Sequence, residues 1–179
     1  MEFKETPIEG LIEIFPRVFE DERGLFFECF QEKAFKENGI NVDFVQDNQS
    51  YSTKGVLRGL HFQRAPYAQG KLVRVISGRV LDVAVDLREN SRTFGQHYDV
   101  ILDARKNNML YVPEGFAHGF VALEPSVFFY KCTNYYHKAS EGGIIWNDKT
   151  LNINWGYENP LVSEKDQELQ SFEEFKNSL

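Results

Sequence analysis

The sequence is poor in the features that mark disulfide-linked, secreted or membrane proteins. Its only cysteines, Cys29 and Cys132, lie far apart and each stands within an aromatic run, which indicates two buried free thiols. Free thiols favour a reducing compartment, so we expect a cytoplasmic location. The first residues lack the basic and apolar regions of a secretory signal, and no apolar run approaches the ~20 residues that cross a bilayer. We therefore expect no membrane partner.

Basic residues are in the minority. Lys and Arg number 20 against 27 Asp and Glu, which gives a net charge of −7 and an isoelectric point of about 5.2. This balance argues against nucleic acid as a general partner, although a local cluster of cations could still bind a phosphate. Linkers, low-complexity segments and internal repeats are also absent. A chain of 179 residues of this kind suits one domain over residues 1–179.

Aromatic and β-branched residues are abundant. The 16 Phe and 8 Tyr predict an aromatic-lined cavity or a substantial interface, with core packing as the alternative. Strand-like segments recur at intervals of ~8–12 residues, which is typical of an all-β sandwich or barrel. Two of them, residues 11–15 and 24–30, flank the turn EDERG. Two others flank Ser77 and Gly78, where the sequence predicts a hairpin.

Helical sequence is confined to two short stretches. Residues 31–39 contain strong helix formers followed by a glycine, and predict one short helix. Residues 161–175 predict a C-terminal helical segment that starts at Ser163. Asp166 follows three residues later, which is the spacing of a capping box, so one interpretation gives Asp166 only a helix-capping role.

Residues 55–63, GVLRGLHFQ, place Arg58 and His61 in an otherwise apolar, strand-like run. Polar groups in a core need partners, so such a run indicates a site; a surface-facing Arg58 and a hydrogen-bonded core His61 are the alternative. Strict alternation would put the two side chains on opposite faces of a strand. If both face one pocket, the strand must bulge or twist, and Gly59 marks the place.

Two segments have the form of the paired motifs of cupin barrels. The first runs from Gly55 and carries His61, and the second, PEGFAH, ends in His118. In metal-binding cupins the first motif supplies His-x-His and then a glutamate, and the second supplies one more histidine. Here Gln63 stands at the second histidine position, and the glutamate position falls at Tyr67 or Ala68.

Two histidines alone make a poor site for a divalent transition metal, which normally takes at least three protein ligands when catalytic. We therefore expect an all-β cupin barrel with a few short flanking helices and without its metal, and the proton chemistry open to it needs no redox cofactor.

Proton chemistry is open to such a barrel. His61 suits a general base because the unperturbed pKa of histidine lies near neutral pH. Lys71 could stabilise negative charge on an oxygen, and Tyr130 could return a proton from the opposite side. The alternatives are a solvated strand-end charge for Lys71, one aromatic among many for Tyr130, and a turn-capping role for His118.

The motifs together resemble the dTDP-4-dehydrorhamnose 3,5-epimerase family over about residues 14–166. The blocks that carry the resemblance are DERGLFFE, FVQDNQS, GVLRGLHFQ, AQGKLVRV, DVAVDLR, SRTFGQ, VPEGFAHGF, YKCTNYY, EGGIIWND and SEKD. The resemblance implies a homodimeric, metal-independent jelly roll that acts on a nucleotide-linked 4-keto sugar on the route to dTDP-L-rhamnose.

The resemblance also implies roles for single residues. His61 would be the catalytic base, Asp166 the acid that orients it, Tyr130 the proton donor and Lys71 the cation beside the keto oxygen. Asp82 would support the site from behind. The substrate-contact positions fall on Arg23, Glu28, Gln46, Asn48, Arg58, His118, Glu141 and Lys165, and the candidates for stacking on the base are Phe26, Tyr136 and Trp146.

The implied reaction fits these side chains. A C4 ketone acidifies the hydrogens at C3 and C5, so a base can form an enolate, and reprotonation from the other face inverts the carbon. A relative that inverts one centre, or that moves the ketone, would use nearly the same pocket. More distant alternatives are a metal-dependent cupin oxygenase or isomerase, and a non-catalytic sugar-binding cupin. The combination of a base, a donor and a cation argues against the binder.

Overall fold

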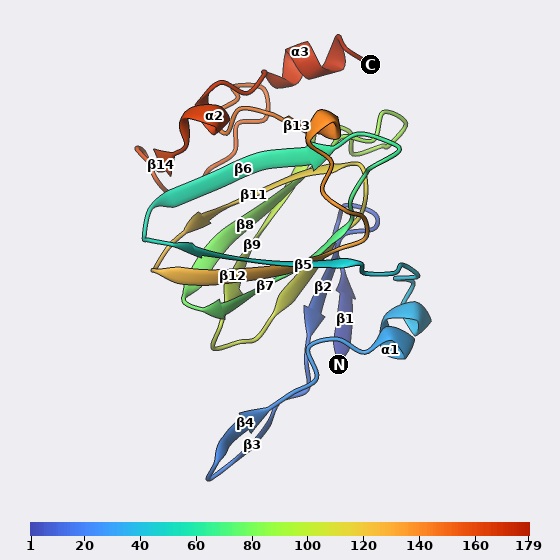
Figure 1. Ribbon diagram of the computed structural model, residues 1–179, viewed down its shortest axis with the longest axis vertical. Helices are drawn as coiled ribbons and strands as arrows, with labels where there is room; N and C mark the ends of the chain where they lie inside the picture. The colour runs from blue at the N-terminus through green and yellow to red at the C-terminus, as the bar shows by residue number, and fades with distance from the viewer.

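Two β-sheets that face one another form the body of the protein (Figure 1), in a computed structural model that describes residues 1–179. The first sheet has the spatial order β1 (Glu2–Glu5), β2 (Ile12–Phe15), β10 (Met109–Val112), β7 (Lys71–Ser77), β12 (Ser126–Cys132) and β5 (Gln46–Ser52). The second has the order β13 (Glu141–Gly143), β6 (Val56–Gln63), β11 (Phe116–Ala122), β8 (Arg79–Asp86) and β9 (His97–Asp103), and β14 (Leu161–Val162) also pairs with β6. The predicted all-β jelly roll of the cupin type is confirmed.

The second sheet is covered on both faces, which explains the almost continuous apolar sequence of β8. Val80 and Ala84 pack into the core between the sheets. Val83 and Val85 pack on the other side, in a cluster that includes Phe172 near the C-terminus. A strand buried on both faces lacks the alternation of apolar and polar residues that marks a half-exposed strand. Asp82 therefore lies in the middle of the core, fully buried.

The predicted hairpin around Ser77 and Gly78 is wrong. β7 pairs with β10 and β12 in the first sheet, whereas β8 pairs with β11 and β9 in the second. Gly78 has a φ of +81°, and a Cβ there would lie 2.3 Å from the carbonyl oxygen of Pro125. The glycine thus turns the chain from one sheet to the other, and a turn signal alone does not distinguish this crossing from a hairpin.

The helices are short and lie outside the sheets (Figure 1). The predicted helix of residues 31–39 is confirmed as α1 (Glu32–Glu37). The C-terminal helical segment is two helices, α2 (Glu164–Gln167) and α3 (Phe172–Lys176), and a 3-10 turn, η1 (Lys138–Ser140), precedes β13. Between α2 and α3 the chain forms a β-bridge from Gln170 to Ile144. No helix combines the length and the apolar character that crossing a membrane requires.

An arm made of β3 (Phe19–Asp21) and β4 (Gly24–Phe26) extends from the body of the protein (Figure 1). The turn between these strands is confirmed, but the second strand stops at Phe26 rather than continuing to residue 30. Beyond the arm, Cys29 is exposed, so its predicted burial is wrong, while Cys132 is buried as predicted. The arm has no sheet to pack against within the chain, and its aromatic residues are therefore left in solvent.

Candidate active site

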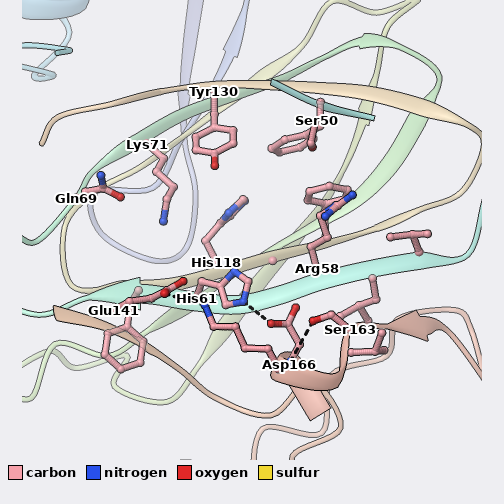
Figure 2. A pocket seen from close by; sticks show the side chains of 18 of the residues that line it. Ser50, Arg58, His61, Gln69, Lys71, His118, Tyr130, Glu141, Ser163 and Asp166 are labelled. Atoms are coloured by element: carbon pink, nitrogen blue, oxygen red, sulfur yellow. Dashed lines mark hydrogen bonds and ion pairs between the residues drawn. The ribbon is translucent and has the colours of Figure 1, made fainter. Parts of the chain in front are cut away.

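A cavity of about 640 Å³ opens between the two sheets. Five strands, the loop that carries Tyr136 and the short helix α2 supply its imidazole, charged and phenolic side chains, most of which Figure 2 labels. Eight of the residues predicted for the site line it: His61, Lys71, Tyr130, Asp166, Arg58, His118, Glu141 and Lys165. Tyr136, a candidate for stacking on the nucleotide base, lines it as well. Residues far apart in the sequence thus converge on one cavity.

His61 and Asp166 form a hydrogen-bonded pair at one wall of the cavity (Figure 2). Nε2 of His61 lies 2.7 Å from Oδ1 of Asp166. A carboxylate only accepts, so Nε2 carries the proton and Nδ1 of the neutral ring keeps a free lone pair. Nδ1 has no hydrogen-bond partner, and 33% of the His61 side chain is exposed. The ring is thus oriented by the carboxylate and has a basic nitrogen to offer.

The start of α2 explains why Asp166 can reach the histidine. Ser163 caps the helix, because its Oγ accepts the backbone N–H of Asp166 at 3.2 Å. The carboxylate of Asp166 does not accept the backbone N–H of Ser163, as it would in a capping box. It accepts from His61 and, through Oδ2, from the backbone N–H of Gly59 at 3.2 Å. The geometry therefore favours the site interpretation of Asp166 over the helix-capping one.

The pKa of Asp166 is lowered. Burial alone would raise it, but the bonds from His61, from the Gly59 amide and from Ser163 outweigh the loss of solvent. Asp166 is consequently ionised at neutral pH. A charged carboxylate behind the imidazole would stabilise an imidazolium if His61 accepted a proton.

Both Arg58 and His61 line the cavity, as the prediction of an irregular strand required. The β6–β11 ladder changes register between His118 and Phe120. At this place Gly59 has a φ of +125°, and a Cβ there would lie 2.6 Å from the Cα of Gly119. Only glycine fits both the backbone conformation and the close approach.

Lys71 and Tyr130 come from the first sheet and lie across the cavity from His61 (Figure 2). Lys71 starts β7, Tyr130 lies in β12, and neither makes a side-chain hydrogen bond or an ion pair. Burial lowers the pKa of Lys71, while Cys132 and two carboxylates oppose this shift. Burial raises the pKa of Tyr130, so its hydroxyl is protonated at neutral pH. An unpaired amino group and an unpaired proton donor thus face the histidine.

His118 and Asp82 form a second pair between these walls. Nε2 of His118 lies 3.0 and 2.9 Å from the two carboxylate oxygens of Asp82. Only 8% of the His118 side chain is exposed, and Asp82 is fully buried. The pair belongs entirely to the second sheet, since β8 carries Asp82 and the adjacent β11 carries His118.

Glu141, Lys165 and Tyr136 form a polar cluster at the mouth. Oε2 of Glu141 lies 2.7 Å from Nζ of Lys165 and accepts the Tyr136 hydroxyl at 2.9 Å. Burial would raise the pKa of Glu141, but these two partners lower it, and the pKa of Lys165 is raised in return. Both groups of the ion pair are therefore charged at neutral pH.

Several predicted site residues lie outside the cavity. Arg23 and Phe26 are on the exposed arm and Glu28 follows it. Gln46 and Asn48 share the half-buried face of β5, as the period of two predicted, and their amides bond each other at 3.0 Å. Trp146 packs against the outer core of the second sheet and is wrong as a neighbour of this cavity.

Sequence reasoning also missed residues that line the cavity. Ser50 is on the same face of β5 as Gln46 and Asn48, so the period of two could have found it. Gln63 and Gln69 also line it, and Gln63 entered the sequence argument only as a missing metal ligand. Across the whole chain, no group of three or more His, Cys, Asp or Glu side chains is arranged to hold a metal ion.

Comparison with known proteins points to one family. The family model for dTDP-4-dehydrorhamnose 3,5-epimerase matches residues 5–174. The dTDP-4-dehydrorhamnose 3,5-epimerase of Shigella flexneri is 54% identical over 169 residues, 93% of each chain.

Two solved structures agree with this match. The dTDP-6-deoxy-D-glucose-3,5-epimerase of Legionella pneumophila, solved with dTDP-4-keto-L-rhamnose, has a TM-score of 0.91 and 47% identity, and covers 95% of this chain and 92% of its own. A 3'-monoepimerase from Streptomyces bikiniensis, solved with dTDP-quinovose, has a TM-score of 0.91 and 30% identity over 97% of this chain and 89% of its own. The jelly roll, the convergent cavity and these matches together show that the chain belongs to the dTDP-4-dehydrorhamnose 3,5-epimerase family.

Proposed function

We propose that the protein inverts C3 and C5 of dTDP-4-dehydro-6-deoxy-D-glucose to give dTDP-4-dehydro-L-rhamnose, without a metal. The observation that carries this proposal is the placement of an oriented histidine on one wall and of an unpaired tyrosine and lysine on the other (Figure 2). Inversion of a carbon through an enolate needs a base and a proton donor on opposite faces of the sugar ring. His61 and Tyr130 meet this requirement.

The reaction starts when Nδ1 of His61 removes the proton from C3 or C5. The electron pair of the C–H bond forms a C=C bond, and the C4 carbonyl becomes an enolate oxygen. Lys71 stabilises this oxygen, since a cation in a water-poor cavity interacts strongly with developing charge. Tyr130 then protonates the carbon from the opposite face and restores the ketone. Solvent carries the proton from His61 back to Tyr130, which restores both residues. Because substrate and product are isomers, no redox equivalent is consumed.

The nucleotide end of the substrate needs cations for its diphosphate. Arg58 lies on the same cavity wall as His61, and its guanidinium is held by Ser52 Oγ at 3.0 Å and by the Tyr51 carbonyl at 3.1 Å. Lys165 is a second cation at the mouth, with 61% of its side chain exposed. A guanidinium can bind phosphate oxygens in a fork, which gives Arg58 the stronger claim to the diphosphate.

The arm residues fit the same reaction only if the protein is a homodimer. Arg23 and Phe26 lie on an arm that extends away from the two sheets of its own chain (Figure 1), neither lines the cavity, and Phe26 is 66% exposed. We propose that the arm of one copy reaches the cavity of the other. Light scattering should give a dimer mass, and a mixture of Arg23→Ala and His61→Ala proteins should regain activity. A fully active monomer would contradict this arrangement.

A cytoplasmic location and a single domain over residues 1–179 stay predictions.

Deuterium incorporation tests the reaction directly. The purified protein is incubated with dTDP-4-keto-6-deoxyglucose in D2O, and proton NMR follows C3 and C5. Exchange at both carbons supports the 3,5-epimerase, and no exchange at all would refute it. The monoepimerase relative makes inversion of one centre the second candidate, and exchange at a single carbon would select it. Stoichiometric iron, manganese or zinc in the purified protein would instead favour a metal-dependent cupin.

A further inference from the structure

Gln63 has a use in the structure that the missing metal ligand does not suggest. It ends β6, two residues beyond His61, lines the same cavity and is 8% exposed. Its Nε2 donates to the carbonyl oxygens of Tyr67 at 2.6 Å and of Tyr135 at 3.2 Å. Its Oε1 accepts the backbone N–H of His137 at 2.7 Å. Both ends of the amide are therefore hydrogen-bonded to the backbone of two loops, one that carries Tyr67 and one that carries Tyr135 and His137.

The loop of residues 134–137 depends on side chains for its backbone hydrogen bonds. Besides the two bonds to Gln63, Nε2 of Gln69 donates to the Asn134 carbonyl at 2.6 Å. The backbone N–H of Tyr136 donates to Oε1 of Gln46 at 3.1 Å. Three glutamines from separate places in the sequence thus hold a segment that forms neither helix nor strand. A loop held in this way keeps its shape before any ligand arrives.

This loop carries Tyr136 to the mouth of the cavity. The Tyr136 hydroxyl donates to Glu141, and Glu141 is ion-paired with Lys165. Glu141 also lies directly opposite Gln63 in the β13–β6 ladder. The same amide therefore borders the polar cluster on one side and anchors the backbone that carries Tyr136 on the other.

The second loop is joined to the first through the same residue. Gln63 holds the Tyr67 carbonyl, and the Tyr67 ring stacks on the His137 ring with centroids 3.8 Å apart and planes 10° from parallel. Loss of the Gln63 amide would remove the partners of two carbonyls and one N–H in partly buried hydrogen bonds, and would free both loops at once.

We propose that Gln63 is a positioning residue, whose amide fixes the loop of residues 134–137 and thereby holds Tyr136 and Glu141 where they receive the nucleotide-sugar substrate. The inference rests on the proposed function. The strand position that carries a metal ligand in other cupins here ties the mouth of the cavity together. Gln63 bonds none of the side chains assigned to proton transfer, so its influence falls on binding rather than on chemistry.

Steady-state kinetics of Gln63→Leu test the proposal. We expect KM for the nucleotide sugar to rise about 10- to 100-fold while kcat changes less than about threefold, because a displaced loop costs binding and leaves the base and donor in place. Gln63→Glu should behave similarly, since a carboxylate would face two carbonyl oxygens. Gln69→Leu removes a single bond to the same loop and should raise KM less. Gln96→Leu makes the same chemical change at an exposed glutamine with no side-chain bond and should leave both constants unchanged.

Two measurements keep the proposal independent of the epimerase activity. Hydrogen exchange of the His137 amide should be at least about tenfold faster in Gln63→Leu than in the wild type or Gln96→Leu. Calorimetry with dTDP should show a matching loss of affinity. A wild type without activity would refute the proposed function and leave these two results standing. Unchanged dTDP affinity and unchanged His137 exchange in folded Gln63→Leu and Gln63→Glu would overturn the positioning role.

Discussion

Two histidine–aspartate pairs lie side by side in the cavity, and their differences show how the same residue types receive different tasks. His61 and His118 are opposite each other in the β6–β11 ladder. In both pairs Nε2 bonds the carboxylate, at 2.7 Å for His61 and 2.9 Å for His118. However, the His61 side chain is 33% exposed and that of His118 only 8%. We therefore expect access to the substrate, rather than the pairing itself, to decide that His61 acts as the base and His118 as a fixed contact.

The two carboxylates also differ in where they come from. Asp82 belongs to β8 and reaches His118 within one sheet. Asp166 comes from a short helix and also accepts the backbone N–H of Gly59. This amide belongs to the glycine at the irregularity in β6, so one carboxylate fixes both the histidine ring and the bulged strand. The His61 pair is thus built from parts distant in sequence, and the His118 pair from neighbours in a ladder.

Replacing each histidine by alanine should produce the largest difference in activity between the two pairs. His61→Ala should lower kcat by about 10³- to 10⁴-fold because the neighbouring imidazole of His118 is only 8% exposed and cannot replace it as the base. His118→Ala should lower kcat/KM by only about 10- to 100-fold through lost contacts. Turnover assays of both variants, with circular dichroism to verify folding, make the comparison. A larger loss of kcat in His118→Ala would reverse the assignment.

Removal of the aspartates should give a smaller contrast of the same sign. Asp166→Asn should lower kcat about 10²- to 10³-fold, since a neutral amide cannot stabilise the imidazolium of His61. Asp82→Asn should act mainly on KM, by about tenfold, and should cost about 1–3 kcal/mol of stability because the pair is buried.

Ser163→Ala provides the control for the aspartates. It removes the cap of α2 and should cost about 1 kcal/mol of stability, with little effect on kcat. If Asp166→Asn lost stability alone and kept full turnover, helix capping would be its role after all.

Acid unfolding should show the smallest effect. The folded-state pKa of Asp166 is lowered, so its stabilisation is present above the ordinary carboxyl pKa of about 3.9 and is lost as the pH falls through the folded value. The free energy of unfolding, measured with urea from pH 6 to about pH 3, should therefore fall less steeply for Asp166→Asn than for wild type.

Asp86 is the reference for this titration. Burial raises its pKa, but bonds from Arg88, Ser91 and Thr93 bring it down to about 2. Asp86→Asn should consequently reduce the fall of the unfolding free energy toward low pH more than Asp166→Asn does. Equal slopes for wild type and both variants would show that neither carboxylate gains its charge stabilisation on folding.

The sequence predicted the components of the site better than their connections. His61, Lys71 and Tyr130 stand in strands whose motifs fix the strand and the face, so their convergence followed from the jelly roll. The predicted hairpin at Gly78 was wrong because a turn signal reports local backbone shape and carries no information on which sheet the next strand joins. Strand partners depend on contacts between distant residues, which a single sequence does not display.

The remaining differences have related causes. Gln63 was predicted only as an absent ligand, because its three partners are backbone groups that leave no trace in the sequence. Arg23 and Phe26 could be assigned to a substrate by resemblance, yet the fold of one chain leaves them on an exposed arm. The role between two copies that we propose for them depends on an assembly, which one chain does not display.

Deuterium exchange in two variants tests the central claim most directly, namely that base and donor act from opposite walls. The substrate is incubated in D2O with Tyr130→Phe and with His61→Ala, and NMR follows both label and configuration at C3 and C5. The account predicts that Tyr130→Phe still exchanges the protons but returns substrate with its original configuration, while His61→Ala neither exchanges nor inverts. Exchange retained by His61→Ala and lost in Tyr130→Phe would contradict it.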